Sequence, residues 1–206
     1  MKFVIPIFII VALSLLWFAN EILPKEVDYI HVVDKINSKI ISKMKKKYNL
    51  FIFGEGGGMP WDVKMVALSF HLYHLVDLQE ARTMIVDLVQ EYLKEINTNK
   101  KIRPYLRNYP FTLENLEFTI FILQPNGHLP PLEHIHCITA AKGIIEYELS
   151  ILPSDYAKDF PLLKQETLEE ALEILKEESE SSTSKQTNMF IQSDSLNLQD
   201  QQKQCV

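Results

Sequence analysis

The stretch that decides the fold is residues 63–97, VKMVALSFHLYHLVDLQEARTMIVDLVQEYLKEIN. Its first part, residues 63–74, alternates apolar residues with small or polar ones, which predicts a half-buried strand. Asp77 then predicts a helix N-cap, and Glu80 three residues later completes a capping box. Apolar residues follow at three- and four-residue steps to about Asn97, which predicts an amphipathic helix. The stretch is therefore a strand followed by a helix.

Working outward, the sequence predicts one helix before this stretch and one after it. Residues 27–48 have apolar side chains at helical spacing, and lysines crowd the last turns: Lys39, Lys43, Lys46 and Lys47. These lysines either suit the negative end of the helix dipole or attract anionic headgroups. Residues 166–178 predict a short acidic helix. Residues 179–206 are rich in Ser, Gln and Asn and predict a disordered polar tail.

Three further strands are expected after the central helix. Residues 116–123 alternate, and residues 134–139 and 144–151 flank Ala-Ala-Lys-Gly143, which predicts a hairpin. Of a two-residue loop at Ala141-Lys142 and a three-residue loop ending at Gly143, the second keeps one face apolar. It places Ile135 and Cys137 on the core side and turns His136 toward Glu148. Residues 50–53 predict a short extended run, and the glycine-rich residues 54–60 predict a flexible loop, or a lid that contacts a ligand.

These elements predict an α+β domain over residues 23–178, with a small, mainly antiparallel sheet of about four strands and helices packed on one face. An N-terminal transmembrane or signal helix over residues 1–22 precedes it, because Phe3 to Ala19 is seventeen residues without a charge. Lys2 precedes this apolar run and mostly acidic residues follow it. The positive-inside rule then predicts a cytoplasmic N-terminus and a single pass through membrane lipid by residues 3–19, with the domain extracytoplasmic, in the periplasm.

Cleavage of this segment is the alternative. A signal-peptidase site wants small residues at −3 and −1, and a cut after Ala19 puts the bulky Trp17 at −3. Trp17 and Phe18 suit the interfacial belt at the end of a membrane span instead. The sequence therefore favours a retained anchor over a secreted product.

Composition narrows the classes of function. The formal net charge is −6 and only 3 of the 21 basic residues are Arg, which argues against a nucleic-acid partner. Two cysteines do not make a disulfide scaffold. The sequence contains neither of the catalytic motifs Gly-x-Ser-x-Gly and His-Glu-x-x-His, and it shows no other pairing of a nucleophile with a base. It therefore favours binding over catalysis and leaves an enzyme as the alternative.

Two constellations are candidates for a site. Arg103, Tyr105, Arg107 and Tyr109 interleave guanidinium groups with aromatic rings, a pattern suited to clasping a carboxylate, phosphate or glycan. Together with Gly56, Gly57 and Gly58 they form the predicted contact surface. In the alternative interpretation the tyrosines and Phe111 are buried while the arginines pair with Glu91, Glu95 or Glu114.

The second constellation is a histidine group. His134 and His136 are two residues apart in a predicted strand, so both are expected on one face. A nearby carboxylate and a third ligand from His71, or from His128, would complete a site for zinc or another divalent ion. No cofactor is expected otherwise, and Cys137 is expected to pack as a small buried apolar residue.

The block from Asp77 to Tyr147 resembles uncharacterised envelope proteins of bacteria that live inside host cells. The shared motifs are Glu-Ala-Arg at 80–82, Ile-Arg-Pro-Tyr-Leu at 102–106, Asn-Tyr-Pro-Phe-Thr at 108–112 and Lys-Gly-Ile-Ile at 142–145. The resemblance implies no known activity. The sequence thus predicts a membrane-anchored, extracytoplasmic, non-catalytic interaction module with a protein partner. The alternatives are a small metal-dependent envelope enzyme and a secreted effector.

Overall fold

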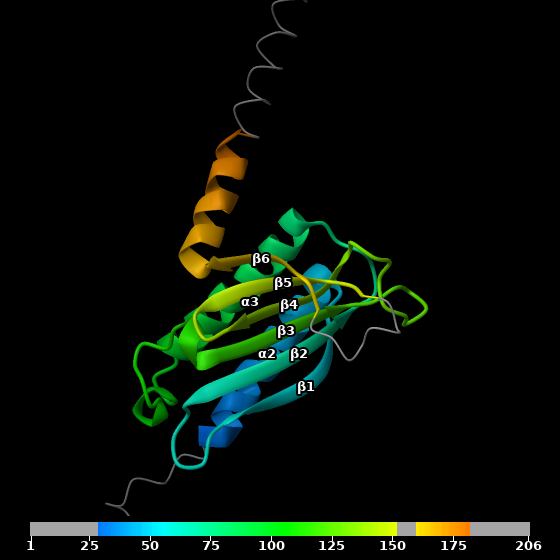
Figure 1. Cartoon of the computed structure of the whole chain (residues 1–206). Helices are drawn as coiled ribbons and strands as arrows, with labels where there is room; N and C mark the ends of the chain where they lie inside the picture. The colour runs from blue at the N-terminus through cyan, green and yellow to red at the C-terminus, as the bar shows by residue number, and fades with distance from the viewer. Residues whose placement is uncertain (1–28, 152–159, 182–206) are drawn as a thin grey trace, which may run out of the picture.

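The computed structural model describes residues 29–151 and 160–181 of the chain. They form an α+β fold in which a six-stranded sheet packs against helices (Figure 1). The elements are α2 (Tyr29–Tyr48), β1 (Phe51–Gly58), β2 (Met65–Leu72), α3 (Leu78–Thr98), the 3-10 turns Arg103–Tyr105 and Leu113–Asn115, β3 (Leu116–Ile122), β4 (Ile135–Ala141), β5 (Ile144–Leu149) and β6 (Leu162–Thr167), followed by a helix over residues 168–181.

The strands lie in the sheet in the order in which they occur in the chain, from β1 at one edge to β6 at the other. All neighbours are antiparallel except β2 and β3, which run parallel. A parallel pair needs a crossover between its strands, and α3 supplies it. The sheet is therefore mixed but mostly antiparallel.

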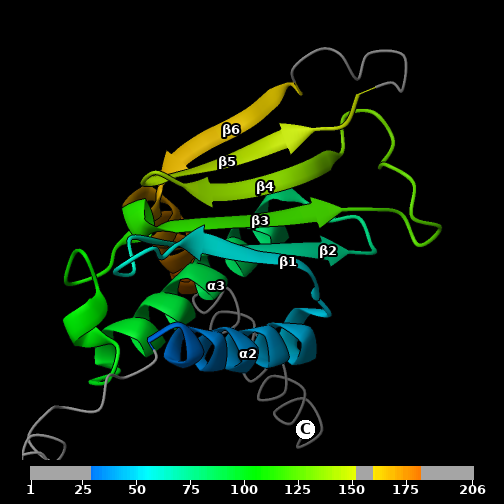
Figure 2. The same cartoon turned by 90° about the horizontal axis from the view of Figure 1, so that it is seen from below.

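The hydrophobic core lies between one face of the sheet and α2 and α3, which Figure 2 shows on the same side. Alternate residues of β2 and β3 point into it, from Val66 to Leu72 and from Leu116 to Ile122. Tyr92 of α3 packs edge-on against Phe118, with ring centroids 5.1 Å apart. The prediction of helices packed on one face is confirmed. The opposite face of the sheet, here called the open face, carries the strand side chains that alternate with those of the core.

The sheet has two strands that the sequence did not predict. Residues 51–58 were expected to be a short extended run and a flexible glycine loop, but they form the edge strand β1 and pair with β2 from Phe51 to Gly58. Ladder hydrogen bonds come from the backbone, so glycine makes them as any residue does. β6 was missed because Leu162 and Leu163 are exposed while Glu166 is buried, the reverse of the usual pattern.

The hairpin of β4 and β5 differs from both predicted registers. Its loop is the two residues Lys142 and Gly143, with φ of 52° and 84°, the left-handed pair that tight hairpins favour. The register shifts between Ile135 and Cys137, so a β-bulge falls at His136. Cys137 therefore lies opposite Glu148 and not on the core side, although it is buried as expected.

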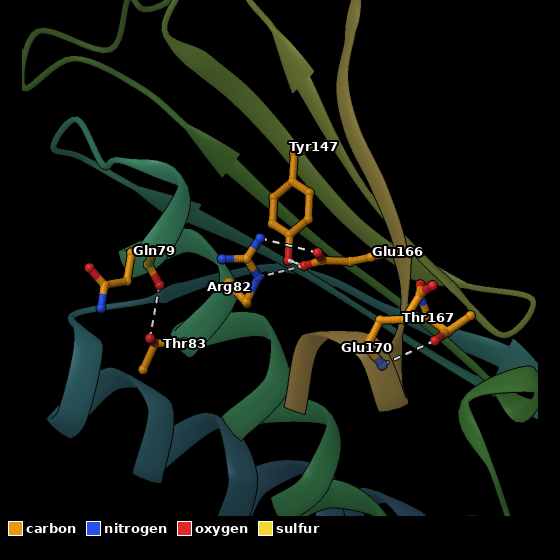
Figure 3. A network of polar contacts seen from close by, with 7 residues as sticks. All are labelled: Gln79, Arg82, Thr83, Tyr147, Glu166, Thr167 and Glu170. Atoms are coloured by element: carbon orange, nitrogen blue, oxygen red, sulfur yellow. Dashed lines mark hydrogen bonds and ion pairs between the residues drawn. The ribbon is translucent and has the colours of Figure 1, made fainter. Parts of the chain in front are cut away.

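A buried polar network joins β6 to the rest of the domain (Figure 3). Arg82 donates from Nε and Nη2 to the two carboxylate oxygens of Glu166, at 2.7 and 3.1 Å. The Tyr147 hydroxyl donates to the same carboxylate at 2.8 Å. Burial raises the pKa of the Tyr147 hydroxyl, and the hydrogen bond to Glu166 raises the pKa of the Arg82 guanidinium. The phenol is therefore neutral and the guanidinium charged.

Side chains cap the helices that follow β2 and β6. The Asp77 carboxylate accepts from the backbone N–H of Glu80, which confirms the predicted N-cap, while the Glu80 carboxylate contacts His74 at 3.2 Å. Thr167 and Glu170 bond reciprocally, each side chain accepting from the other's backbone N–H (Figure 3). This capping box explains why the last helix starts at residue 168 and not at 166.

Both predicted terminal segments fall largely outside the described residues. The anchor, residues 1–22, lies outside them, so it stays a prediction. The polar tail was expected from 179, but the last helix continues to 181, and residues 182–206 lie outside the described part. In residues 29–151 and 160–181, none of the helices combines the length and apolar character needed to cross a bilayer.

Candidate functional site

One end of the sheet gathers three segments that are far apart in the sequence. They are the start of α2, the β1–β2 connection and the segment that follows α3, and Figures 1 and 2 both place them at the same end. Tyr29 joins them: its hydroxyl donates to the Met59 carbonyl at 3.2 Å, and its ring stacks on Tyr105 with centroids 5.2 Å apart. Val63 also forms a parallel bridge with Leu106. These contacts fix the three segments as one surface.

This surface contains the predicted arginine–tyrosine constellation, but its members do not form one clasp. Arg103 lies over the Tyr109 ring, 4.6 Å from its centroid. Arg107 binds the Asp62 carboxylate through Nε at 2.9 Å and Nη2 at 2.8 Å. The hydrogen bond from Arg107 lowers the pKa of the Asp62 carboxyl, so this pair is ionised at neutral pH.

The alternative interpretation of this constellation holds only in part. Phe111 is buried and Tyr105 is half-buried against Tyr29, but Tyr109 is 51% exposed. Arg107 binds Asp62 and Arg103 donates to the Asn97 carbonyl at 3.2 Å, so the expected partners of the arginines were wrong. Glu91 and Glu95 pair instead with lysines of α2.

The glycines lie in β1. Of the three, Gly58 shares a cavity of about 400 Å³ with Arg107, lined also by Lys64, Lys142 and Glu114. The structure thus brings Gly58 and Arg107 together at this cavity. Gly56 and Gly57 pair with Ala67 and Val66 in the sheet and do not line this cavity.

The lysines of α2 are drawn into a ladder with α3. The ion pairs are Lys39–Glu95 at 2.6 Å, Lys43–Glu91 at 2.6 Å and Lys47–Asp87 at 2.8 Å. The start of α2 lies in the surface described above, and a helix of 20 residues is about 30 Å long. The lysine-rich turns therefore lie toward the other end of the domain, which does not favour headgroup attraction by these lysines.

The open face carries an aromatic row, defined here as Phe53, His71, Phe121, His136 and Phe160, which the sequence did not reveal. Successive ring centroids are 4.4, 6.1, 6.1 and 4.6 Å apart, with the two outer pairs stacked. The row crosses β1 to β4, one ring from each strand, and Phe160 is the residue before Pro161 and β6. A row of flat rings binds apolar or planar groups by stacking.

Exposure falls along the row from Phe53 to His136. Phe53 is 66% exposed, whereas His136 is 8% exposed and its Nδ1 has no hydrogen-bond partner among the described residues. Burial lowers the pKa of the His136 imidazole and raises that of the neighbouring Cys137 thiol to about 11. Both groups are therefore neutral at pH 7.

The histidines do not form the predicted metal site. His71 and His136 both contact Phe121, whose ring lies between them in the row, and His134 Nδ1 lies 3.2 Å from the Leu132 carbonyl. Across residues 29–151 and 160–181, no group of three His, Cys, Asp or Glu side chains is placed to hold a metal ion. Comparison with protein-family models, curated proteins and solved structures finds no match to the chain.

Proposed function

We propose that the chain is a membrane-anchored, non-catalytic binding module that presents its α+β domain outside the cytoplasmic membrane. Its partner is a protein that contributes an extended, apolar segment to β1 and the open face. The observation that carries this proposal is the aromatic row, which starts at an exposed ring on an edge strand. Exposed apolar patches mark interaction sites and aromatic residues are enriched at interfaces, and the row begins with Phe53, which is 66% exposed.

The edge strand supports an extended segment as the partner. Among the described residues β1 pairs with β2 alone, so its other side has no neighbouring strand. Phe51, Ile52 and Phe53 are all exposed on it. A peptide that adds to a sheet edge gains backbone hydrogen bonds, and its alternate side chains contact one face of the sheet. Here those side chains would meet Phe53 and His71.

The anchor is supported by the sequence alone. Residues 3–19 carry no charge, Lys2 precedes them, and Glu21 and Glu26 follow. This order favours retention of the N-terminus in the cytoplasm. A tethered domain also suits a weak binding surface, because confinement to a membrane raises the effective concentration of a partner in the same envelope.

Site-directed photocrosslinking in the full-length chain tests the proposal. A photoreactive amino acid replaces Phe53 on the aromatic row, and a matched chain carries it at Gln90, which is exposed on α3 on the other side of the sheet. We expect a discrete protein adduct from the membrane fraction at Phe53 and none at Gln90. Phe121→Ser, which removes the central ring, should weaken that adduct at least several-fold.

Three results would contradict the proposal. An equal yield of adduct at the two positions would mean that the open face is not the binding surface. An adduct that disappears on nuclease treatment would replace the protein partner by a nucleic acid. Release of the full chain from membranes by high salt without detergent would exclude the anchor, since a spanning segment is held by apolar burial and not by charge.

A further inference from the structure

The end of the domain where α2 begins exposes large aromatic side chains that contribute little to the core. Trp61, at the tip of the β1–β2 connection, is 87% exposed, the highest fraction among the exposed large hydrophobic residues described. Tyr109 is 51% exposed, under the Arg103 guanidinium. Trp and Tyr concentrate at membrane–water interfaces, where the ring is apolar and its polar atom stays wet.

The segment that follows α3 at this end is basic in a chain that is acidic as a whole. Residues 99–109 contain four basic residues, Lys100, Lys101, Arg103 and Arg107, and no acidic one. Their side chains are exposed, and within the described part of the chain the ion-pair partner of Asp62 is Arg107. The net charge of the chain is −6, so this segment runs against its average. Exposed basic side chains next to aromatic ones complement anionic headgroups.

The cavity beside this segment has mixed charge and does not reverse that balance. Lys64 and Lys142 line it together with Glu114 and Glu117. The charges of these two glutamates and two lysines cancel. The four basic residues of 99–109 therefore still outnumber the acidic residue beside them, Asp62. We name the side chains of Trp61, Lys100, Lys101, Arg103, Arg107 and Tyr109 the Trp61 surface.

Chain length places the Trp61 surface close to the membrane. Residues 20–28 separate the apolar run from Tyr29, and nine residues span at most about 30 Å even when fully extended. Tyr29 itself contacts Met59 of the β1–β2 connection and Tyr105 of the segment after α3, and these two segments carry the Trp61 surface. The tether therefore ends on the surface that has the composition of a membrane interface.

We infer that the Trp61 surface docks on anionic phospholipid headgroups of the membrane that anchors the chain. Trp61 and Tyr109 insert at headgroup level, and Lys100, Lys101 and Arg103 face the phosphates. His71 of the aromatic row lies six residues along β2 from Met65, about 20 Å from this end. Docking therefore leaves the aromatic row away from lipid and open to a partner. The inference rests on the anchor of the proposed function.

Fluorescence quenching in reconstituted full-length chain tests this inference. Trp17→Phe leaves Trp61 as the sole tryptophan, since the sequence has two. The chain is placed in vesicles of phosphatidylcholine with or without about 30% phosphatidylglycerol, with brominated acyl chains as quencher. We expect at least about twofold more quenching of Trp61 with the anionic lipid than without it. Raising salt from about 0.1 to about 1 M should remove most of this difference, as the Debye length falls from about 10 to about 3 Å.

Three variants distinguish docking of the Trp61 surface from its mere proximity to the membrane. In a Trp17→Phe, Trp61→Phe background, Leu132→Trp places the reporter on the β3–β4 connection at the other end, where Leu132 is 50% exposed, and it should stay unquenched. Lys100→Gln with Lys101→Gln should reduce Trp61 quenching at least about twofold. Lys39→Gln with Lys43→Gln removes the same charge from α2 and should leave the quenching unchanged.

Flotation of the vesicles distinguishes the hypothesis of a membrane anchor from the hypothesis that the Trp61 surface docks on headgroups. If the chain floats with vesicles but Trp61 is quenched no more than the Leu132→Trp reporter, the docking inference is wrong and the anchor stands. If Trp61 is quenched equally with and without anionic lipid, headgroup recognition is wrong. If the chain does not float at all, anchor and docking both fail.

Discussion

Glu166 of β6 accepts two hydrogen bonds from the guanidinium of Arg82 of α3, although the two residues are 84 positions apart in the chain. The side chains are 1% and 6% exposed, so the pair is shielded from water. Together with the Tyr147 hydroxyl it holds an edge strand that has little apolar burial of its own. The packing of β6 therefore depends on a long-range polar contact.

Glu166→Gln is expected to destabilise the domain strongly. The amide keeps the shape of the side chain but leaves the Arg82 cation buried without its counter-charge, which typically costs about 3–5 kcal/mol. Denaturant unfolding of the full chain in detergent micelles measures this loss. Glu170→Gln, at an exposed cap, should cost about 1 kcal/mol or less. The double variant Arg82→Met, Glu166→Met should lose less free energy of unfolding than the sum of the losses in its two single variants, Arg82→Met and Glu166→Met. Strict additivity would contradict a coupled pair.

His136 is expected to make stability depend on pH. Burial lowers the pKa of its imidazole in the folded chain, so the unfolded chain binds the proton first as the pH falls. The stability it confers is fully present above about pH 6.5 and is lost as the pH falls through the lowered pKa of the folded state. Its share of the slope reaches at most about 1.4 kcal/mol per pH unit.

Unfolding of the full chain between pH 7.5 and pH 5 measures this effect. His136→Phe, which keeps a ring against Phe160, should flatten the pH profile, whereas His128→Phe at an exposed position should not. If the His136→Phe variant shows the same pH dependence of stability as the wild type, the His136 imidazole is protonated equally in the folded and the unfolded chain.

Cys137 is expected to react slowly with alkylating reagents. The thiolate is the reactive form, and burial raises the pKa of this thiol to about 11 while leaving the residue 5% exposed. At pH 8 the thiolate fraction is about a hundredfold below that of an ordinary thiol. Cys205→Ser leaves Cys137 as the sole thiol, and mass spectrometry after iodoacetamide treatment then gives its rate. Reaction as fast as that of the unfolded chain would contradict the buried position.

The central part of the fold could be predicted because its residues follow a regular period. The strand expected over 63–74 is Met65–Leu72, and the helix expected to end at about Asn97 is Leu78–Thr98. Both elements have one face against the core and one toward solvent, so their apolar residues recur with the period of a strand or a helix. Local periodicity was sufficient there.

The edge strands and the site depend on contacts between distant residues. The Glu166 carboxylate of β6 points inward because it pairs with the buried Arg82 guanidinium of α3. No local sequence pattern indicates this pairing. Arg103 and Tyr109 are close in sequence and do meet, but the partner of Arg107 is Asp62, 45 positions away. The aromatic row could not be predicted from local patterns, because its rings lie on different strands and meet only in the strand order of the folded sheet.

Glycine substitutions in β1 test directly whether residues 54–58 form a strand. A Cβ at Gly57 would lie 2.6 Å from the Met65 carbonyl oxygen, a backbone atom that must shift to admit it. Gly57→Ala should therefore destabilise the full chain by about 1–3 kcal/mol. A Cβ at Gly56 meets Ala67 at an ordinary 3.9 Å, and Gly56→Ala should leave stability within about 0.5 kcal/mol or raise it, since alanine orders a strand at less entropic cost. Thermal unfolding compares the two variants, and equal effects at the neighbouring positions would indicate a loop and not a paired strand.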